Sequence, residues 1–317
     1  MTNYIGIDLG GTTVKTGLFS MDGCLLNHTE IPTRSSLGRE TIWKDIADSV
    51  RSLAAIENAD LSSCRIGMGM PGPIETDGFL EAAVNLNMYN LYPGKELSVF
   101  LDGMPVKVAN DANAAALGEM WKGGAQGYKN LILITLGTGV GSGVIIDGSV
   151  VYGAHGLGGE IGHIWVNPDE PELCKCGGRG CLDQMASATG IVRNAHRFLA
   201  KSSQDSILRN RENLTAKDVI DAAKDGDEIA VEVVNYCMSF LGKAIADITY
   251  VIDPDVVVIG GGISKAGTYI LDLIFEHYRN FPMIKKCRTH FELAKLGGDA
   301  GMYGAAYLAK QADFVAS

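Results

Sequence analysis

One histidine and three cysteines lie close together near the middle of the chain, at His163, Cys174, Cys176 and Cys181. Three thiolates and one imidazole complete the tetrahedral shell of a protein zinc site, and a shell with no position left for water is structural. The alternative is three small buried thiols and an ordinary histidine. Because the thiols cluster among glycines, we favour the metal site, which would also fix Glu160 just before the histidine.

A second candidate site stands near the N-terminus, where a short apolar stretch ends in a polar turn. The turn combines one carboxylate with two glycines and two hydroxyls, at Asp8, Gly10, Gly11, Thr12 and Thr13. Exposed N–H groups in such a turn can cradle a phosphate. The carboxylate would repel phosphate unless it holds Mg2+, directly or through water. Lys15 could add a positive charge, although an ordinary hairpin with a Gly-Gly turn is also compatible with the pattern.

The glycine turn recurs further along the chain, at Gly137, Thr138 and Gly139. Both copies read as strand, Gly/Thr turn and strand, then an Asp-Gly turn and another strand, which indicates an internal duplication. A dinucleotide-binding fingerprint does not fit, because a strand rather than a helix follows each turn. Gly261 and Gly262 precede a helix, and helix N-termini after glycine turns bind anions or admit a flat ring.

Asp111 follows a predicted strand over 105–109 and precedes a predicted helix over 114–121. A carboxylate just past a strand end lies where α/β folds place ligands. It could equally be a helix N-cap. Asn85 belongs to a loop with two further asparagines, which could bind hydroxyl groups, although turns also favour asparagine for backbone reasons.

The composition limits the class of protein. The length of 317 residues predicts two domains, and the net charge of −10 argues against nucleic acid as a partner. The N-terminal sequence does not resemble a signal peptide, and no apolar run reaches the length of a membrane span. An odd cysteine count with metal spacing indicates a reducing compartment. We therefore expect a cytoplasmic protein without a membrane partner.

The later part of the chain is predicted to be largely helical. We expect one helix over 184–199, a helix capped by Thr215 and Asp218, and a long buried helix over 227–250. A further helix should begin near Lys265, and the last should cover 302–310.

Four motifs stand in one order: DLGGT, NDAN, the GTGxG to GGEIGH segment with CxCGxxGC, and GGG before a helix. In this combination the chain resembles the ROK family of bacterial sugar kinases, and within it the glucokinases of Gram-positive bacteria. The resemblance implies an α/β, actin-like ATPase fold of the hexokinase and ribonuclease H type, with two lobes and a cleft between them. The expected small lobe is 1–113 plus 300–317, and the large lobe is 114–299 with the zinc-bearing loop.

The resemblance also implies roles for the residues described above. The family transfers the ATP γ-phosphoryl group to a hexose, here most simply the 6-hydroxyl of glucose, with Asp111 as general base and Asp8 at the phosphate and Mg2+. ATP and its phosphates would contact Asp8, Gly10, Gly11, Thr12, Thr13, Lys15, Gly137, Thr138, Gly139, Gly261 and Gly262. The sugar would contact Gly72, Asn85, Asn110, Asp111, Glu160, His163 and Asp183. The family usually has glutamate where this chain has Asp183, so the reach of that carboxylate to the sugar is shorter.

Two other functions fit parts of the pattern. A ROK kinase could act on N-acetylmannosamine, fructose, allose or a β-glucoside instead, and a polyphosphate donor is less expected than ATP. A sugar-sensing regulator of the family carries a helix-turn-helix domain ahead of DLGGT, and only seven residues precede Asp8 here. Family members are often dimers or tetramers, so we expect a homo-oligomer.

Overall fold

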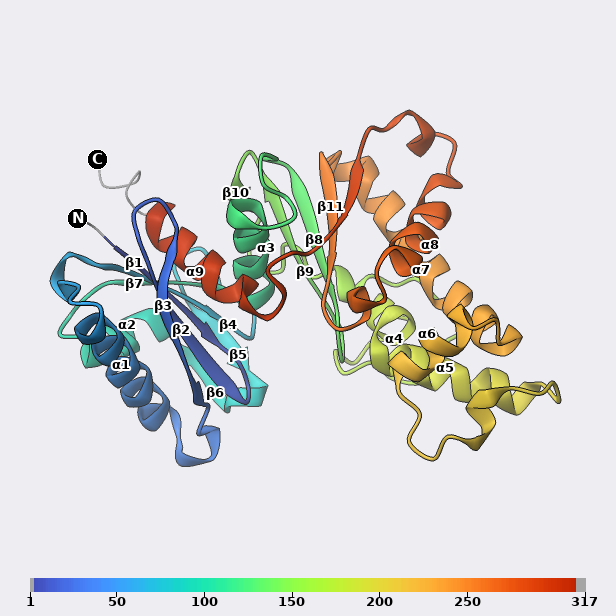
Figure 1. The fold of residues 1–317 in the computed structure, drawn as a ribbon, viewed down its shortest axis with the longest axis horizontal. Helices are drawn as coiled ribbons and strands as arrows, with labels where there is room; N and C mark the ends of the chain where they lie inside the picture. The colour runs from blue at the N-terminus through green and yellow to red at the C-terminus, as the bar shows by residue number, and fades with distance from the viewer. Residues whose placement is uncertain (1–2, 312–317) are drawn as a thin grey trace. The chain divides into compact units, whose positions relative to one another are not determined.

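The computed structural model describes residues 3–311 and contains two compact units, drawn in Figure 1. Unit 1 comprises residues 1–129, 143–159 and 295–317, and unit 2 comprises residues 130–142 and 160–294. The expected lobe boundaries at 113/114 and 299/300 differ from this division. Residues 111–122 belong to unit 1 because that helix packs closely on the last helix of the chain.

Unit 1 is built on a five-stranded sheet in which three parallel strands adjoin an antiparallel hairpin. Its strands are β1 (Tyr4–Leu9), β2 (Thr13–Phe19), β3 (Leu25–Pro32), β4 (Arg65–Met70) and β7 (Val106–Asn110). They lie in the order β3-β2-β1-β4-β7, with β1, β4 and β7 parallel. A small separate hairpin consists of β5 (Leu80–Ala83) and β6 (Met88–Leu91). The parallel strands therefore end at one edge of the sheet, where polar side chains can gather.

Two apolar clusters hold the helices of unit 1 to its sheet. Helix α1 (Arg39–Ile56) buries its apolar stripe against β2 and β3, and α2 (Pro93–Phe100) packs on β7. Helix α9 (Ala300–Gln311) covers β1 and β4 and contacts α3 (Asp111–Lys122). The last two helices approach so closely that a Cβ on Gly304 would lie 1.5 Å from the Ala114 carbonyl oxygen. Glycine is therefore required there, because any side chain would separate the helices.

The sheet associated with unit 2 repeats the strand order of the first. Its strands are β8 (Leu131–Leu136), β9 (Val140–Ile146), β10 (Ser149–Val150), β11 (Val256–Gly260) and β12 (His290–Leu293), in the order β10-β9-β8-β11-β12. As in the first sheet, the central strand pairs in parallel with the next strand along the row, and that strand pairs in parallel with the edge strand: β8 with β11, and β11 with β12. The duplication predicted from the glycine turns is confirmed, because β1 corresponds to β8 and each turn joins the first two strands of its half.

The helices of unit 2 differ in two places from those expected. Its helices are α4 (Leu182–Ala186), α5 (Ala188–Lys201), α6 (Ala216–Lys224), α7 (Glu228–Ile252) and α8 (Thr268–Arg279). The single helix predicted over 184–199 is wrong, because Ser187 has extended backbone and its hydroxyl caps α5 by accepting from Gly190 N–H. Helix α8 begins at Thr268 rather than near Lys265 as expected, since a 3-10 turn and Gly267 at φ +74° precede it.

Helix α7 is the long apolar helix predicted from the sequence. Among residues 3–311 it alone has the length and hydropathy of a membrane span, yet 61% of that stretch is buried within the fold. Its apolar residues pack against α4, α5, α6 and α8. Burial of this kind is typical of the core helix of a globular protein.

Candidate functional site

The carboxyl ends of the parallel strands of unit 1 bring the predicted catalytic residues to one edge. Asp8 is in register with Gly69 on β4, and Met70 on that strand is in register with Asn110 on β7. A Cβ on Gly69 would lie 3.8 Å from the Cα of Asp111, so that carboxylate and Asp8 occupy the same edge. Because Gly69 has no side chain, no side chain from this position of β4 lies between Asp8 and Asp111.

Asn110, rather than Asp111, performs the capping of α3. The Asn110 Oδ1 accepts from Ala112 N–H at 2.9 Å and from Asn113 N–H at 3.2 Å. Its Nδ2 donates to the carbonyl oxygen of Gly72 at 3.1 Å. Asp111 is the first residue of the helix and its side chain is exposed within the polar edge. The capping role considered for Asp111 therefore belongs to its neighbour, and its own carboxylate remains accessible.

The first glycine turn lies beside the same edge. Gly10 N–H donates to the Thr13 carbonyl oxygen at 2.9 Å, and the Thr33 hydroxyl donates to the Gly10 carbonyl oxygen at 2.8 Å. Gly11 is exposed, and a Cβ on it would lie 3.8 Å from the Cβ of Asn85. The turn is thus fixed from behind while its tip stays open, and Asn85 lies next to it.

Charges around Asp8 set the electrostatics of this edge. Burial and the negative charge of Asp111 raise the pKa of the Asp8 carboxyl to about 6, while Lys15 opposes the shift. The ammonium group of that lysine donates to the Gly298 carbonyl oxygen and to Asp299 Oδ1, both at 2.7 Å. Asp299 was not predicted as a site residue, because its partner is distant in sequence and no local motif marks it. Although the side chain of Asp111 is open to solvent, the protein atoms around it also raise its pKa by desolvation, against hydrogen bonds from its own helix terminus and from Asn110.

One cavity of about 480 Å³ in unit 2 is lined by Gly137 and Thr138 of the second glycine turn and by Gly262. Gly139 and Gly261 are their neighbours in the chain but do not line it. A Cβ on Gly261, which has φ +82°, would lie 2.5 Å from the Leu136 carbonyl oxygen, so only glycine allows the two segments to meet. The walls also include residues that the sequence analysis treated only as parts of a helix. These are Thr215, Ala216, Lys217, Ile220, Asp221 and Lys224. The volume lies in the range of nucleotide and cofactor sites.

The predicted zinc ligands lie together in unit 2. Their donor atoms are all within 4.8 Å of one another, with Cys176 Sγ 3.5 Å from Cys181 Sγ and Cys174 Sγ 3.8 Å from His163 Nδ1. These separations suit a central ion with metal–sulfur distances of about 2.3 Å. Burial and the two neighbouring thiols raise the pKa of Cys181 to about 12. The donor set thus fits a structural Zn2+, with the Nδ1 of the histidine as the ring nitrogen nearest to Cys174.

Ion pairs also hold the segment between His163 and Cys174. Glu170 is 3% exposed and receives both Nη groups of Arg197, at 2.8 and 2.9 Å, with Arg193 at 3.5 Å. The hydrogen bonds from Arg197 lower the pKa of this carboxyl. Both arginines belong to α5. The network was not predicted, because its acidic and basic members are separated in sequence and no motif joins them.

Asp183 lies in an unexpected contact. Its Oδ1 accepts from Val140 N–H at 2.7 Å, and a Cβ on Gly139 would lie 2.5 Å from the same oxygen. The carboxylate therefore supports the second glycine turn with one oxygen. Glu160 and His163 are both exposed, at the two ends of a short 3-10 turn.

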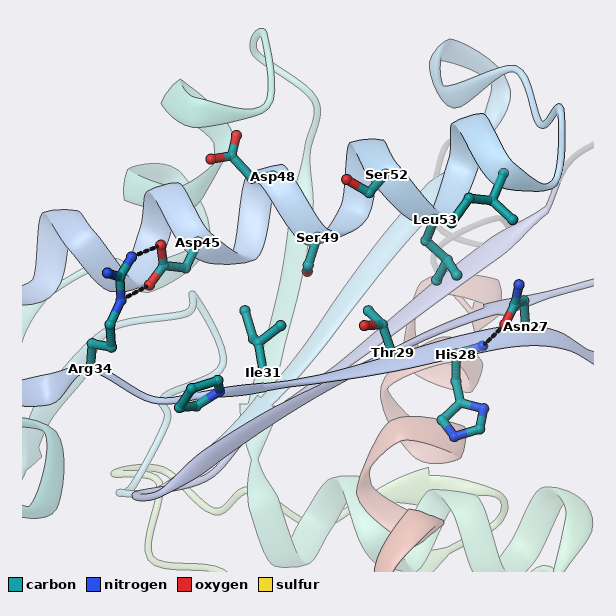
Figure 2. Close-up of a pocket in the computed structure, with 12 residues that line it drawn as sticks. Asn27, His28, Thr29, Ile31, Arg34, Asp45, Asp48, Ser49, Ser52 and Leu53 are labelled. Carbon is teal, nitrogen blue, oxygen red and sulfur yellow. Dashed lines mark hydrogen bonds and ion pairs between the residues drawn. The ribbon is translucent and has the colours of Figure 1, made fainter.

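A groove of about 560 Å³ in unit 1 lies apart from these residues, between β3 and α1. Figure 2 shows the paired side chains of Arg34 and Asp45 at one end of it, and Asn27 at the other. It contains none of the predicted site residues. The groove is therefore a useful location for control substitutions.

The ROK family model matches residues 4–312. The chain belongs to the ROK family. It is 41% identical to a glucokinase from Halalkalibacterium halodurans over 314 residues, which is 97% of this chain and 95% of that protein. Among solved structures, it is similar to a ROK-family glucokinase from Streptomyces griseus in complex with glucose and AMPPNP, with 32% identity, a TM-score of 0.77, and 98% and 99% of the two chains covered. A ROK hexokinase from Thermus thermophilus has a TM-score of 0.84 at 29% identity, covering 98% of this chain and 99% of that one. The fold is thus the actin-like ATPase fold that the sequence motifs implied.

Proposed function

We propose that this protein is an ATP-dependent glucokinase, which converts glucose and ATP to glucose 6-phosphate and ADP. The observation that carries the proposal is the 41% identity to a glucokinase across 97% of the chain. The arrangement of Asp8, Asn110 and Asp111 at one sheet edge supplies groups suited to the chemistry.

Asp111 is the general base in this proposal. Its carboxylate is accessible, and its raised pKa makes it a better proton acceptor than an ordinary aspartate. Asn110 fixes the start of α3 and thereby the position of the base. We assign sugar contacts to Gly72, Asn85, Asn110, Asp111, Glu160, His163 and Asp183, as the family pattern implies.

The cavity of unit 2 is the proposed nucleotide site. Its open walls and glycine segments suit an adenosine group, and the glycine turns carry phosphate-binding N–H groups. Asp8 would hold Mg2+, which neutralises phosphate charge when bound. In this proposal Lys15 would supply positive charge to the phosphates, and each glycine turn would supply N–H donors.

The cluster of His163, Cys174, Cys176 and Cys181 is proposed to hold a structural Zn2+. A four-ligand site leaves no position for substrate, so the ion would fix the loop and take no part in the reaction. The histidine would offer its Nε2 to the sugar, since its Nδ1 faces the thiols.

The proposal is tested by a coupled assay of ADP release with glucose, mannose, N-acetylglucosamine, N-acetylmannosamine, fructose and allose. Glucose should give the highest kcat/KM, and Asp111→Asn should lower kcat by roughly 10² to 10⁴ while glucose binding remains. Asp48→Asn, in the groove of Figure 2, is the matched control on an exposed aspartate of the same unit. No activity on any hexose, or a normal rate in Asp111→Asn, would contradict the proposal.

The proposal extends to the setting of the enzyme. The buried position of α7 supports a protein that does not use this helix to span a membrane. We propose a cytoplasmic location, in line with its unpaired cysteines among the described residues, and a dimer or tetramer, which light scattering of the purified protein would test. A different preferred sugar in the panel would favour another ROK kinase activity. Binding to DNA without kinase activity would favour a regulator.

A further inference from the structure

Glu119 is a buried carboxylate whose hydrogen-bond partners are backbone groups. It lies near the end of α3 and is 0% exposed. Its Oε2 accepts from Gly124 N–H at 2.6 Å and from Lys295 N–H at 3.0 Å, and its Oε1 accepts from Leu296 N–H at 2.9 Å. Burying a carboxylate is costly, and this one is compensated by three charge-assisted hydrogen bonds.

The segment held by Glu119 is where the chain returns to unit 1. Residue 294 is the last of unit 2 and residue 295 the first of the returning segment. Just beyond it, Gly298 and Asp299 bind the ammonium group of Lys15, whose charge acts on Asp8. A Cβ on Gly301 would lie 2.6 Å from the Asp8 carboxyl carbon, so the start of α9 also abuts that carboxylate.

The start of α3 therefore lies at the polar edge, whereas its later part contacts the returning segment. Asp111 is its first residue, and Glu119 lies two turns further along the same helix. The side chain of Glu119 connects this helix to residues 295–296, which lead directly to the partners of Lys15. Because both acidic residues belong to one helix, α3 sets the distance between Asp111 and the segment that Glu119 holds.

We propose that Glu119 is a positioning residue for phosphoryl transfer: through residues 295–296 it fixes the turn that holds Lys15 beside Asp8, relative to the base Asp111. The inference rests on the proposed kinase function. Weakening this anchor should displace Lys15 and Asp8, the proposed phosphate and Mg2+ groups, more than the proposed sugar contacts. Asn110 holds the latter independently, because it caps α3 and donates to the Gly72 carbonyl oxygen.

Glu119→Gln tests the anchor with almost no change in volume. The Nε2 of the new amide cannot accept a hydrogen bond, although the Oε1 can, so at least one N–H of the three loses its partner. We expect kcat to fall by about 10- to 100-fold and KM for MgATP to rise, because small misplacements of reacting groups cost this much. KM for glucose should change by less than about two-fold.

A second pair of variants leaves Glu119 in place. Leu296→Pro removes the N–H that donates to Glu119 Oε1, at a residue whose φ of −83° is near the range of proline. Leu296→Ala removes the same side chain but keeps the N–H. The proline variant should reproduce the loss in kcat, and the alanine variant should not. Equal kcat in the two variants would overturn the proposal.

Asp227→Asn is the control for a general loss of stability. Asp227 also joins two segments, accepting from Ala230 N–H at 3.0 Å and Ile207 N–H at 2.8 Å, but in unit 2. Its kcat per folded molecule should equal that of the wild type. If Glu119→Gln has a normal kcat, or loses activity only in proportion to its unfolded fraction as the control does, the positioning role is wrong.

Hydrogen exchange separates this inference from the proposed function. In Glu119→Gln, and not in Asp227→Asn, the amides of residues 295–299 should exchange faster than in the wild type. If the wild type phosphorylates no hexose, the proposed function fails while this measurement still tests whether Glu119 fixes the turn. Unchanged exchange there would overturn the inference even in an active kinase.

Discussion

Removing the charge of Asp8 should stabilise the metal-free protein while abolishing its activity. Its carboxyl has a pKa raised from 3.8 to about 6, chiefly by burial and by Asp111. A carboxyl with a raised pKa favours the protonated form in the folded state. Between pH 4 and 6 the folded state therefore binds more protons than the unfolded state, and the free energy of unfolding falls as pH rises. Asp8→Asn removes this loss, because asparagine has no charge to bury.

The size of the effect follows from the shift. The difference between 3.8 and about 6 corresponds to roughly 3 kcal/mol in total, of which about half develops between pH 5 and 8. The free energy of unfolding of Asp8→Asn, minus that of the wild type, should therefore increase by roughly 1–2 kcal/mol over that range. Mg2+ should stabilise the wild type more than the variant, since the proposed ligand is missing.

Urea denaturation followed by tryptophan fluorescence measures the free energy of unfolding of unit 1, to which Asp8 belongs. Trp43 is buried and Trp121 half-buried in unit 1, whereas Trp165 in unit 2 is 69% exposed. The change in fluorescence on unfolding thus reports mainly on unit 1. Measurements at pH 5, 6, 7 and 8 without Mg2+ give the curve for each protein, and each transition is fitted separately because two units need not unfold together.

Lys15→Met provides the diagnostic companion to Asp8→Asn. The lysine charge lowers the pKa of Asp8, so its removal should move that pKa upward and deepen the loss of stability toward pH 8. Parallel pH curves for wild type and Asp8→Asn, or a curve for Lys15→Met identical to the wild type, would refute the reasoning.

Two further predictions concern unit 2. Removal of Zn2+ by a chelator should raise KM for glucose about ten-fold or more and lower the melting temperature, and added Zn2+ should reverse both; unchanged sugar affinity in the metal-free protein would contradict a role for the ion in placing His163. Asp183→Ala removes the acceptor for Val140 N–H. Since this carboxylate supports the second glycine turn, the variant should raise KM for MgATP as well as KM for glucose. A rise in KM for glucose alone would indicate that Asp183 only binds the sugar.

Local signals predicted most of the strands, the glycine turns and the grouping of His163 with three cysteines. The hairpin of β5 and β6 was missed, because its asparagines indicated a loop. Each correct prediction depends on residues near one another in the chain, such as the apolar stretch before Asp8 or the three cysteines between residues 174 and 181. The capping of α6 by Thr215 and Asp218 was also correct, because a cap depends on four consecutive residues. Such features need no knowledge of tertiary contacts.

Features made by distant residues could not be predicted in the same way. The pairs Lys15 with Asp299 and Glu170 with Arg197 join different elements, and nothing in the local sequence marks either pair. The single helix expected over 184–199 was wrong because its pattern continues across Ser187, whose hydroxyl instead begins a new helix. The division of the chain followed the contact between α3 and α9, which depends on packing rather than on a linker.

The two repeated sheets differ at the position of Asp8, the proposed metal-binding carboxylate. Asp8 on β1 is in register with Gly69, and the equivalent pair in the second sheet is Thr135 and Gly260. The glycine is kept in both halves, whereas the carboxylate is replaced by a hydroxyl in the second. A second buried carboxylate would add a cost of the kind seen at Asp8, without a further ion to offset it. Both halves therefore keep the glycine turn that we propose binds phosphate, whereas only the first half keeps the charge, and the cost of burying a second carboxylate accounts for this difference.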